Sequence, residues 1–164
     1  MKYVLIGKLV NTHGLKGEVR ILSDFKYKDR VFRPGMKIYI GKDKVCEEIV
    51  SYRHHKIFEM IMMKGYDDID QVLKYKGEYV FVNKSDIELN PGEYLDEDII
   101  GLKVIADGIE RGTVRRIEKH NKNEILVIKN NVKNYLIPYN FDIIENVDLE
   151  KREMIVKNIL GLFE

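Results

Sequence analysis

Short runs of strand-forming residues, separated by polar turns, recur along the whole chain and restrict the folds that it can adopt. In the first half the runs are Tyr3–Val10, Glu18–Leu22, Met36–Ile40, Lys44–Tyr52, Ile57–Met63 and Tyr79–Asn83. In the second half they are Leu102–Ala106, Gly112–Glu118, Glu124–Lys129, Tyr135–Pro138, Ile143–Val147 and Met154–Val156. This spacing is typical of antiparallel barrels or sandwiches, and closing a sheet removes edges that would otherwise aggregate. We therefore expect an all-β fold.

Two local features interrupt or connect these runs. The segment Asp67–Leu73 carries apolar residues at helical spacing, which predicts one short amphipathic helix with carboxylates at its start. The polar stretch Arg53–Lys56 predicts a hairpin with a four-residue loop. By contrast, the acidic triplet Asp96–Asp98 is expected to be a solvated strand entry.

A polar segment with a strong breaker divides the chain. Asn90-Pro91-Gly92 lies within residues 84–93, so we expect a first domain over 1–83, a linker over 84–93 and a second domain over 94–164. Each half is roughly 70–80 residues, near the lower limit for one core. The first core is predicted to contain Val4, Ile6, Val19, Ile21, Ile38, Ile40, Ile61 and Val80. The second is predicted to contain Val104, Val114, Ile117, Leu126, Ile128, Ile137 and Ile155.

The totals exclude several classes of protein. No apolar run approaches the roughly 18 residues that span a membrane, and the N-terminus lacks the apolar core of a signal peptide. Cys46 is the single cysteine of the 164 residues, so no intrachain disulfide can form. We expect a cytoplasmic, monomeric protein.

Charge is distributed unevenly although the net charge is +1. Residues 1–83 hold 16 lysines and arginines against 11 aspartates and glutamates, whereas residues 94–164 hold 11 against 13. A basic first half can bind phosphate, and a mildly acidic second half suits a basic protein. The alternative is that these charges are ordinary solvated surface residues with no binding role.

The cations of the first half are concentrated between positions 8 and 44, where ten lysines and arginines face four acids. Phe25, Tyr27, Phe32 and Tyr39 lie among them. Cations interleaved with aromatic side chains can bind phosphate and stack on bases. The alternative is scattered surface charge with aromatic residues in the core.

Gly7 lies in the first strand, and Gly14 and Gly17, three residues apart before the second strand, predict a tight, shaped turn. It lacks the glycine order of phosphate-binding loops, and a strand follows where those loops need a helix. Gly14-Leu15-Lys16-Gly17 matches the GxxG loop of KH domains, but strands flank it here, so we reject that fold. Lys16 could still contact a phosphate.

No pattern of catalysis or metal binding is found in the sequence. His13 suits a turn, His54 and His55 are flanked by cations, and His120 lies in a charged loop, which disfavours zinc. Cys46 has no CxxC partner and no identifiable base. We therefore expect no enzyme, no cofactor and no metal.

The glycine run, together with later motifs in a fixed order, resembles the RimM family of 16S rRNA processing and ribosome maturation factors. The later motifs are Asp98-Ile99-Ile100-Gly101-Leu102, Gly112-Thr113-Val114, Leu136-Ile137-Pro138, Val147-Asp148-Leu149 and Leu160-Gly161-Leu162. The resemblance implies two small antiparallel β-barrels joined by a short linker. The first would be similar to the second domain of translation elongation factors, and the second would be a PRC-type barrel.

The resemblance also implies site residues. In the family, an aromatic pair just before a DLIGL-like run is associated with ribosomal function, and here Tyr94 matches while Leu95 departs. Asp98 matches the first residue of that run, and Ile99 replaces its leucine. Tyr94, Leu95 and Asp98 are therefore candidate contacts for a protein partner.

We expect a non-catalytic assembly factor of the small ribosomal subunit. By resemblance its partners are a ribosomal protein of the subunit head, number nineteen in the usual naming, and the immature subunit with its 16S rRNA. Lys16, Arg20 and His13 are candidate RNA contacts. Two alternatives stay open: a stand-alone RNA-binding barrel without a ribosomal protein partner, and an enzyme or cofactor carrier in a barrel fold.

Overall fold

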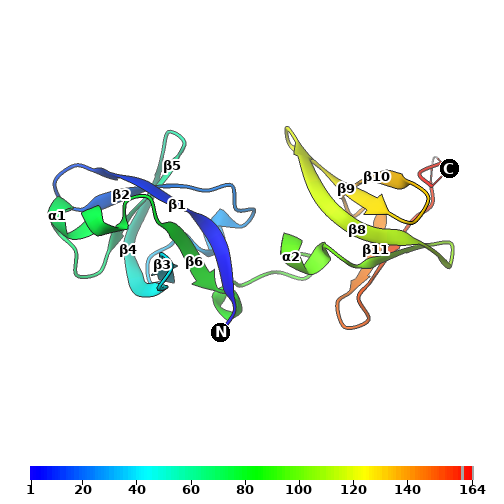
Figure 1. The fold of residues 1–164 in the computed structure, drawn as a ribbon, viewed down its shortest axis with the longest axis horizontal. Coiled ribbons are helices and arrows are strands. Elements are labelled where there is room, and N and C mark those ends of the chain that lie inside the picture. The colour runs from blue at the N-terminus through cyan, green and yellow to red at the C-terminus, as the bar shows by residue number, and fades with distance from the viewer. Residues whose placement is uncertain (160, 164) are drawn as a thin grey trace. The chain divides into compact units, whose positions relative to one another are not determined.

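The computed structural model describes residues 1–159 and 161–163 of the chain. These residues divide into two compact units, Met1–Leu89 and a second unit that begins at Asn90 (Figure 1). The division falls within the segment 84–93 that the sequence suggested as a linker. Its first residues, Lys84–Asp86, form a 3-10 turn whose start is capped by the Asn83 side chain. Each unit is described by itself below.

The first unit is a closed six-stranded barrel. Its strands are β1 Tyr3–His13, β2 Glu18–Leu22, β3 Lys37–Ile40, β4 Val45–His55, β5 Phe58–Met63 and β6 Tyr79–Asn83. The hydrogen-bonded order is β1-β2-β5-β4-β3-β6, and β6 pairs back to β1. All six pairs are antiparallel. No strand of this unit is left with an unpaired edge, which is the advantage of closure.

Alternation of side chains along the strands fills this barrel. In β1, Val4 and Ile6 are buried while Tyr3 and Leu5 are exposed. All eight residues predicted for the first core are buried. Tyr27, Phe32 and Tyr39 are buried as well, so most aromatic residues of the basic stretch are structural rather than available for base stacking.

The predicted short helix of the first unit is present as α1, Ile69–Val72. Asp68 caps it: its Oδ1 accepts a hydrogen bond from the Asp70 N–H at 2.9 Å, and the Gln71 side chain accepts one from the Asp68 N–H at 3.1 Å. This reciprocal arrangement satisfies backbone donors that a helix start leaves free. Two 3-10 turns complete the unit, η1 at Lys28–Arg30 and η2 at Leu73–Tyr75.

The second unit is a six-stranded sheet preceded by a helical turn, α2 Asp96–Ile99. Its strands are β7 Lys103–Ala106, β8 Ile109–His120, β9 Asn123–Lys129, β10 Asn134–Pro138, β11 Ile144–Asp148 and β12 Glu153–Val156. Their order is β10-β9-β8-β7-β12-β11. The buried core includes Ile99, Leu102, Leu126, Ile137 and Met154. The expected all-β fold with two domains is confirmed.

Several local predictions need correction. β12 runs parallel to β7, so the second sheet is not purely antiparallel. The acidic triplet Asp96–Asp98 forms the first turn of α2 instead of entering a strand. The four-residue loop is wrong, because β4 continues to His55, which pairs with Phe58 and leaves only two residues in the turn. Ile155 is 36 % exposed and lies outside the core, whereas Met154 and Val156 are buried.

Candidate nucleic-acid and protein interfaces

The turn between β1 and β2 has the shape that its glycines suggested. Gly14 and Gly17 have φ angles of 72° and 91°, a region that side chains other than glycine rarely adopt. A Cβ on Gly17 would stand 3.1 Å from the Asp68 carbonyl oxygen. The Ile69 N–H also donates to the Leu15 carbonyl at 2.9 Å. The turn is thus fastened to the start of α1, and Lys16 is exposed at its tip.

Two of the predicted RNA contacts meet beside this turn. The Arg20 Nη2 lies 2.6 Å from the His13 Nδ1. Because a guanidinium has no acceptor, Nη2 donates and Nδ1 accepts in this contact. The Arg20 guanidinium also lies over the Phe58 ring, 5.4 Å from its centroid. The cation is therefore held between an imidazole and an aromatic ring.

His55 joins this group, although sequence reasoning had assigned it to a loop. Its ring centroid is 6.1 Å from that of His13. Burial lowers the pKa of His55, and the nearby charges of Arg53 and Lys56 lower it further. His55 therefore stays mostly neutral near pH 7, and a phosphate placed beside it would favour its protonated form.

Most of the positive charge in this group is not neutralised. Glu18 pairs with Arg53 through both oxygens, with Nε and Nη2 at 2.9 and 2.7 Å. That contact holds the pKa of Glu18 below its usual value. Among the described residues, no carboxylate lies within ion-pair distance of Arg20, Lys16 or Lys56. We call His13, Lys16, Arg20, His55 and Lys56 the basic end of the first barrel.

A buried carboxylate lies in the wall of the same barrel, and sequence reasoning missed it. Glu59, on β5, is only 1 % exposed. Its Oε1 accepts hydrogen bonds from the Tyr52 hydroxyl at 2.7 Å and from the His54 Nδ1–H at 2.9 Å, and the Lys28 Nζ is 4.0 Å from Oε2. Burial and this hydrogen bond raise the pKa of Tyr52 to about 12. The hydrogen bonds of Glu59 with Tyr52 and His54 cross-link β4 and β5. The described contacts of Glu59 include no second carboxylate, which a paired-carboxylate acid–base site would need.

The predicted protein contacts are arranged around α2 in the second unit. Leu95 precedes the helix and is only 4 % exposed, so its side chain offers almost no surface to a partner. Tyr94 is partly buried and packs against the second core. Asp98 is half-buried in the helical turn, and its N–H donates to the Leu95 carbonyl at 3.0 Å. Tyr94 and Asp98 remain candidates for the protein contact.

One exposed aromatic residue near α2 escaped the sequence analysis. Phe141, in the loop between β10 and β11, is 61 % exposed. A Cβ on Gly92 would be 3.7 Å from its Cζ atom, so the ring lies against the backbone just before Tyr94. Its sequence signal is a large aromatic residue in a polar turn, between Asn140 and Asp142, where strand alternation gives it no reason to be buried.

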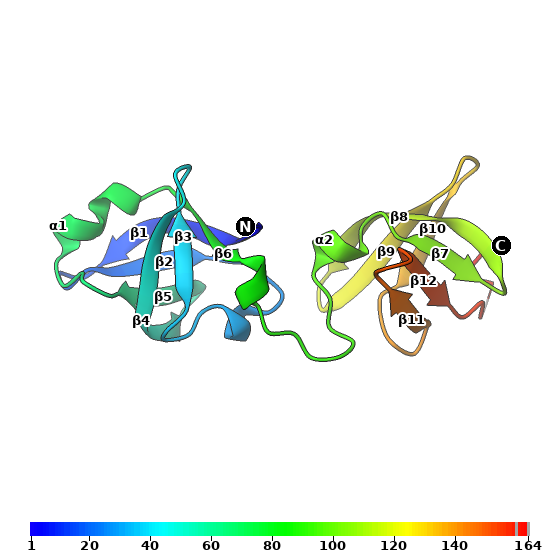
Figure 2. The same ribbon diagram turned by 90° about the horizontal axis from the view of Figure 1, so that it is seen from below.

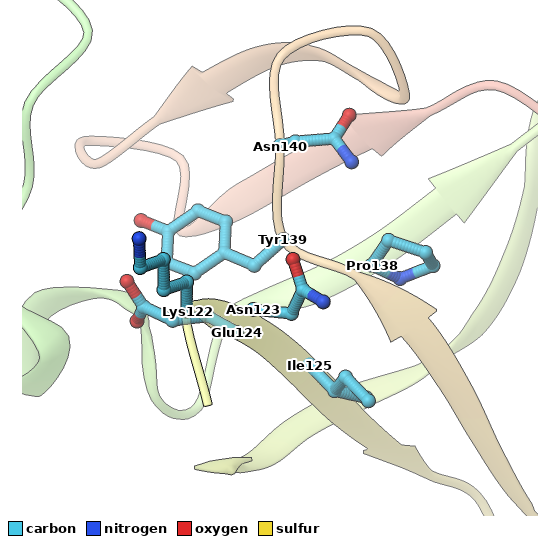
Figure 3. A pocket seen from close by; sticks show the side chains of 7 residues that line it. All are labelled: Lys122, Asn123, Glu124, Ile125, Pro138, Tyr139 and Asn140. Carbon is cyan, nitrogen blue, oxygen red and sulfur yellow. The ribbon is translucent and has the colours of Figure 1, made fainter. Parts of the chain in front are cut away.

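A shallow hollow of about 490 Å³ lies at one end of the second sheet (Figure 3). It is lined by Lys122, Asn123, Glu124, Ile125, Pro138, Tyr139 and Asn140. The Tyr139 N–H donates to the Glu124 carbonyl at 2.9 Å and joins its two walls. Figure 3 shows the polar ends of Lys122, Glu124 and Tyr139 on the same side of the view. Lys122 and Glu124 bring charges of both signs to the lining of the hollow.

Residues 1–159 and 161–163 contain no group of three or more His, Cys, Asp or Glu side chains that could hold a metal ion. Within the same part of the chain, the helices are all too short or too polar to cross a membrane.

Two family models match the chain in the order of its two units. The RimM N-terminal domain matches residues 4–87, and the RimM PRC barrel domain matches residues 96–162. The chain belongs to the RimM family. The RimM-type motifs quoted above therefore lie in the domains to which they were assigned, although Leu160 lies outside the described residues.

Two relatives of similar length support this assignment. The Ribosome maturation factor RimM of Bacillus cytotoxicus is 34 % identical over 168 residues, which cover 98 % of each chain. The protein of the same name from Staphylococcus haemolyticus is 36 % identical over 98 % of this chain and 99 % of its own. A crystal structure of a 16S ribosomal RNA processing protein RimM from Pseudomonas aeruginosa is 26 % identical, covers 95 % of this chain and 97 % of its own, and superposes with a TM-score of 0.45.

Proposed function

We propose that this chain is a non-catalytic assembly factor of the small ribosomal subunit. It binds a ribosomal protein of the subunit head, number nineteen, and assists the processing of 16S rRNA and the folding of the head. The observation that carries the proposal is the match of both domains, over nearly the whole chain, to relatives named ribosome maturation factor.

The basic end of the first barrel is the part that contacts rRNA. Lys16 protrudes on a turn that is fastened to α1, so its charge is presented on a fixed support. The His13 ring and the Phe58 ring hold the Arg20 guanidinium in one place. An arginine that is already oriented loses less conformational entropy when it binds a phosphate.

The second unit carries the protein contact. Its net charge is slightly negative, which complements the basic surface that ribosomal proteins present to RNA. Around α2 it offers two aromatic side chains, the partly buried Tyr94 and the exposed Phe141. Aromatic residues of this kind are enriched among the side chains that contribute most to protein–protein affinity.

The mechanism is selective binding of one assembly intermediate. A factor that contacts both a head protein and rRNA stabilises the assembly state in which it can bind the two at the same time. It shifts the population of that intermediate only by its differential affinity for it. Release follows when the head matures and the affinity falls.

A stand-alone RNA-binding barrel is the second candidate, because the basic end alone would suffice for it. The two functions are separated by recovering a tagged copy of the chain from cells and measuring what accompanies it. An assembly factor enriches precursor small subunits that contain the head protein, and Phe141→Ala reduces that enrichment. If naked rRNA binds as tightly as the protein-loaded particle, and Phe141→Ala has no effect, the stand-alone module is the better account.

A further inference from the structure

The outer face of the first barrel carries an aromatic cluster that the proposed function does not use. Tyr3, Leu5 and Phe81 point outward from the neighbouring strands β1 and β6, because Val4, Ile6, Val80 and Val82 fill the interior. Strand β3 lies beside β6 (Figure 2), and Tyr39 of β3 is the register partner of Phe81. The outward-facing residues of a small barrel are normally polar. An aromatic cluster on this face is therefore a candidate binding surface.

Tyr3 contacts two neighbouring rings, and the exposure of the cluster falls from Tyr3 and Tyr79, which are exposed, through half-buried Phe81 to buried Tyr39. Tyr3 lies edge-on to Tyr39, with ring centroids 5.2 Å apart, and to Phe81 at 6.5 Å. Tyr79, two residues before Phe81 and on the same face, is 51 % exposed, and Tyr3 is 39 % exposed. Together Tyr3, Leu5, Tyr39, Tyr79 and Phe81 form what we call the aromatic face.

Lysines accompany the rings at two places. The Lys44 Nζ is 4.2 Å from the centroid of Phe81 and 5.6 Å from that of Tyr3. The Lys8 Nζ is 5.4 Å from the centroid of Tyr79, its cross-strand neighbour. An ammonium on a flexible four-carbon stem can leave a ring and pair with a phosphate, and a planar base can then take its place.

We propose that the aromatic face binds a single-stranded segment of RNA by stacking bases on Tyr79 and Tyr3, while Lys8 and Lys44 pair with the flanking phosphates. Rings with adjoining cations are how proteins bind single strands without a sequence code. The charge complementarity favours nucleic acid over an apolar protein surface, because a protein that covered these rings would also have to bury or displace two ammonium groups. The choice of RNA over other single-stranded nucleic acids rests on the proposed function.

The test uses the full chain and a fluorescently labelled ten-nucleotide single-stranded RNA. The comparison ligands are a ten-base-pair RNA duplex and inorganic polyphosphate of equal charge. We expect the single strand to bind more tightly than either, because only its bases are free to stack. Tyr79→Ala should weaken this binding at least about fivefold, while Tyr79→Phe, which keeps the ring, should bind as the natural chain does.

Two controls separate stacking from charge and from a general loss of structure. Ile109→Ala removes an apolar side chain of comparable exposure, 55 %, from the second unit and should leave binding of the single strand unchanged. Lys44→Ala should lower the slope of log affinity against log salt by about 0.7, the value for one phosphate contact on a single strand. Thermal unfolding checks that each variant is folded.

Three results would overturn the proposal. The first is unchanged affinity of folded Tyr79→Ala for the single strand. The second is equal binding of single strand, duplex and polyphosphate, which would mean that charge alone acts. The third is that Tyr79→Ala no longer binds an isolated ribosomal protein but still binds the oligonucleotide. Failure of the natural chain to recover precursor subunits is a different result, and it would contradict the proposed function whatever the oligonucleotide does.

Discussion

Arg20 and His13 face one another across the first hairpin, with the Arg20 Nη2 2.6 Å from the His13 Nδ1. The bond holds the guanidinium where it lies over the Phe58 ring. A charge that is fixed in this way differs from the exposed ammonium of Lys16, although both lie at the basic end of the first barrel. The two residues therefore make separate predictions.

Lys16→Ala should weaken binding to precursor subunits and lower the dependence of affinity on salt by a slope of about 1, as the loss of one phosphate contact does. The free energy of unfolding should stay within about 0.5 kcal/mol, because the side chain is exposed. Filter binding at several salt concentrations measures the slope. Lys64→Ala, which removes an exposed lysine from another turn of the same barrel, is the matched control. Equal effects of the two substitutions would remove Lys16 from the RNA contacts.

His13→Ala should weaken RNA binding, because the imidazole accepts a hydrogen bond from Arg20 and holds the guanidinium in place. His13→Gln, whose side-chain oxygen can accept the same hydrogen bond, should recover part of the affinity. Isothermal titration with a fragment of the rRNA provides the measurement. Normal affinity in His13→Ala would mean that the orientation of Arg20 is irrelevant to binding.

Gly17→Ala should destabilise the first barrel by at least about 1 kcal/mol, because its φ is 91° and the new methyl would stand 3.1 Å from the Asp68 backbone. Gly14→Ala tests the φ contribution alone: its φ is 72°, and nothing lies within 4 Å of the added Cβ. The loss there should be smaller. Urea unfolding of the two variants measures the difference, and a Gly17→Ala chain as stable as the natural one would disprove the close packing of the turn on α1.

The pairing of Glu18 with Arg53 should make stability depend on pH on the acid side. The folded-state pKa of Glu18 lies below its usual value, so the carboxylate stabilises the fold above its unfolded pKa, near 4.5, and this contribution is lost as the pH falls through the folded pKa. Glu18→Gln should therefore lower the free energy of unfolding at pH 7 but have less effect at pH 3. A loss of equal size at both pH values would contradict the ion pair.

Limited proteolysis should cut the chain within residues 84–93 and leave two folded fragments, because polar turns with proline and glycine are preferred cleavage sites. The structure narrows the expected position to the residues after Asp86, since Lys84–Asp86 form a capped turn. Mass spectrometry of the fragments identifies the site. Cuts scattered through both units would argue against independent domains.

Much of the fold could be predicted because most strands are recognisable from their β-branched and aromatic residues and from the polar turns between them. The phase of a strand is harder to predict when both of its faces are apolar. In Met154-Ile155-Val156 no polar residue marks the outward position, so Ile155 was assigned to the core. In Tyr79–Val82 the phase was predicted correctly, with the valines inside and the rings outside, but the pairing of β6 with β1 and β3, which brings the outward rings together, leaves no local pattern. The aromatic face was therefore not visible in the sequence.

Long-range partners explain the other errors. Arg53 and His54 resemble loop residues by polarity, but Glu18 and Glu59 on neighbouring strands bind them and allow β4 to continue. The parallel pairing of β7 with β12 joins segments about fifty residues apart and leaves no local pattern. Among the site residues, Leu95 was a candidate partner contact by family resemblance, yet its side chain is buried. It directly precedes the helical turn α2, and the acidic triplet Asp96–Asp98 gave no sign of that turn.

Phe141 and Tyr94 offer separate tests of the protein contact. Phe141→Ala should weaken binding to the protein-loaded particle and leave the thermal midpoint unchanged, because the ring is exposed. Tyr94→Ala should lower the midpoint by several degrees, since its ring packs against the second core, and Tyr94→Phe should restore it. Calorimetry and particle binding on the same samples distinguish packing from contact. Normal particle binding by folded Phe141→Ala would move the partner surface elsewhere.

The most direct test compares the affinity of the natural chain for precursor and mature small subunits purified from the same cells. Selective stabilisation of an assembly intermediate requires tighter binding to the precursor, by at least about fivefold, the lower end of ordinary coupling between sites. Removal of the head protein from the precursor should abolish the difference. Equal affinity for the two particles, or tighter binding to the mature subunit, would contradict the account.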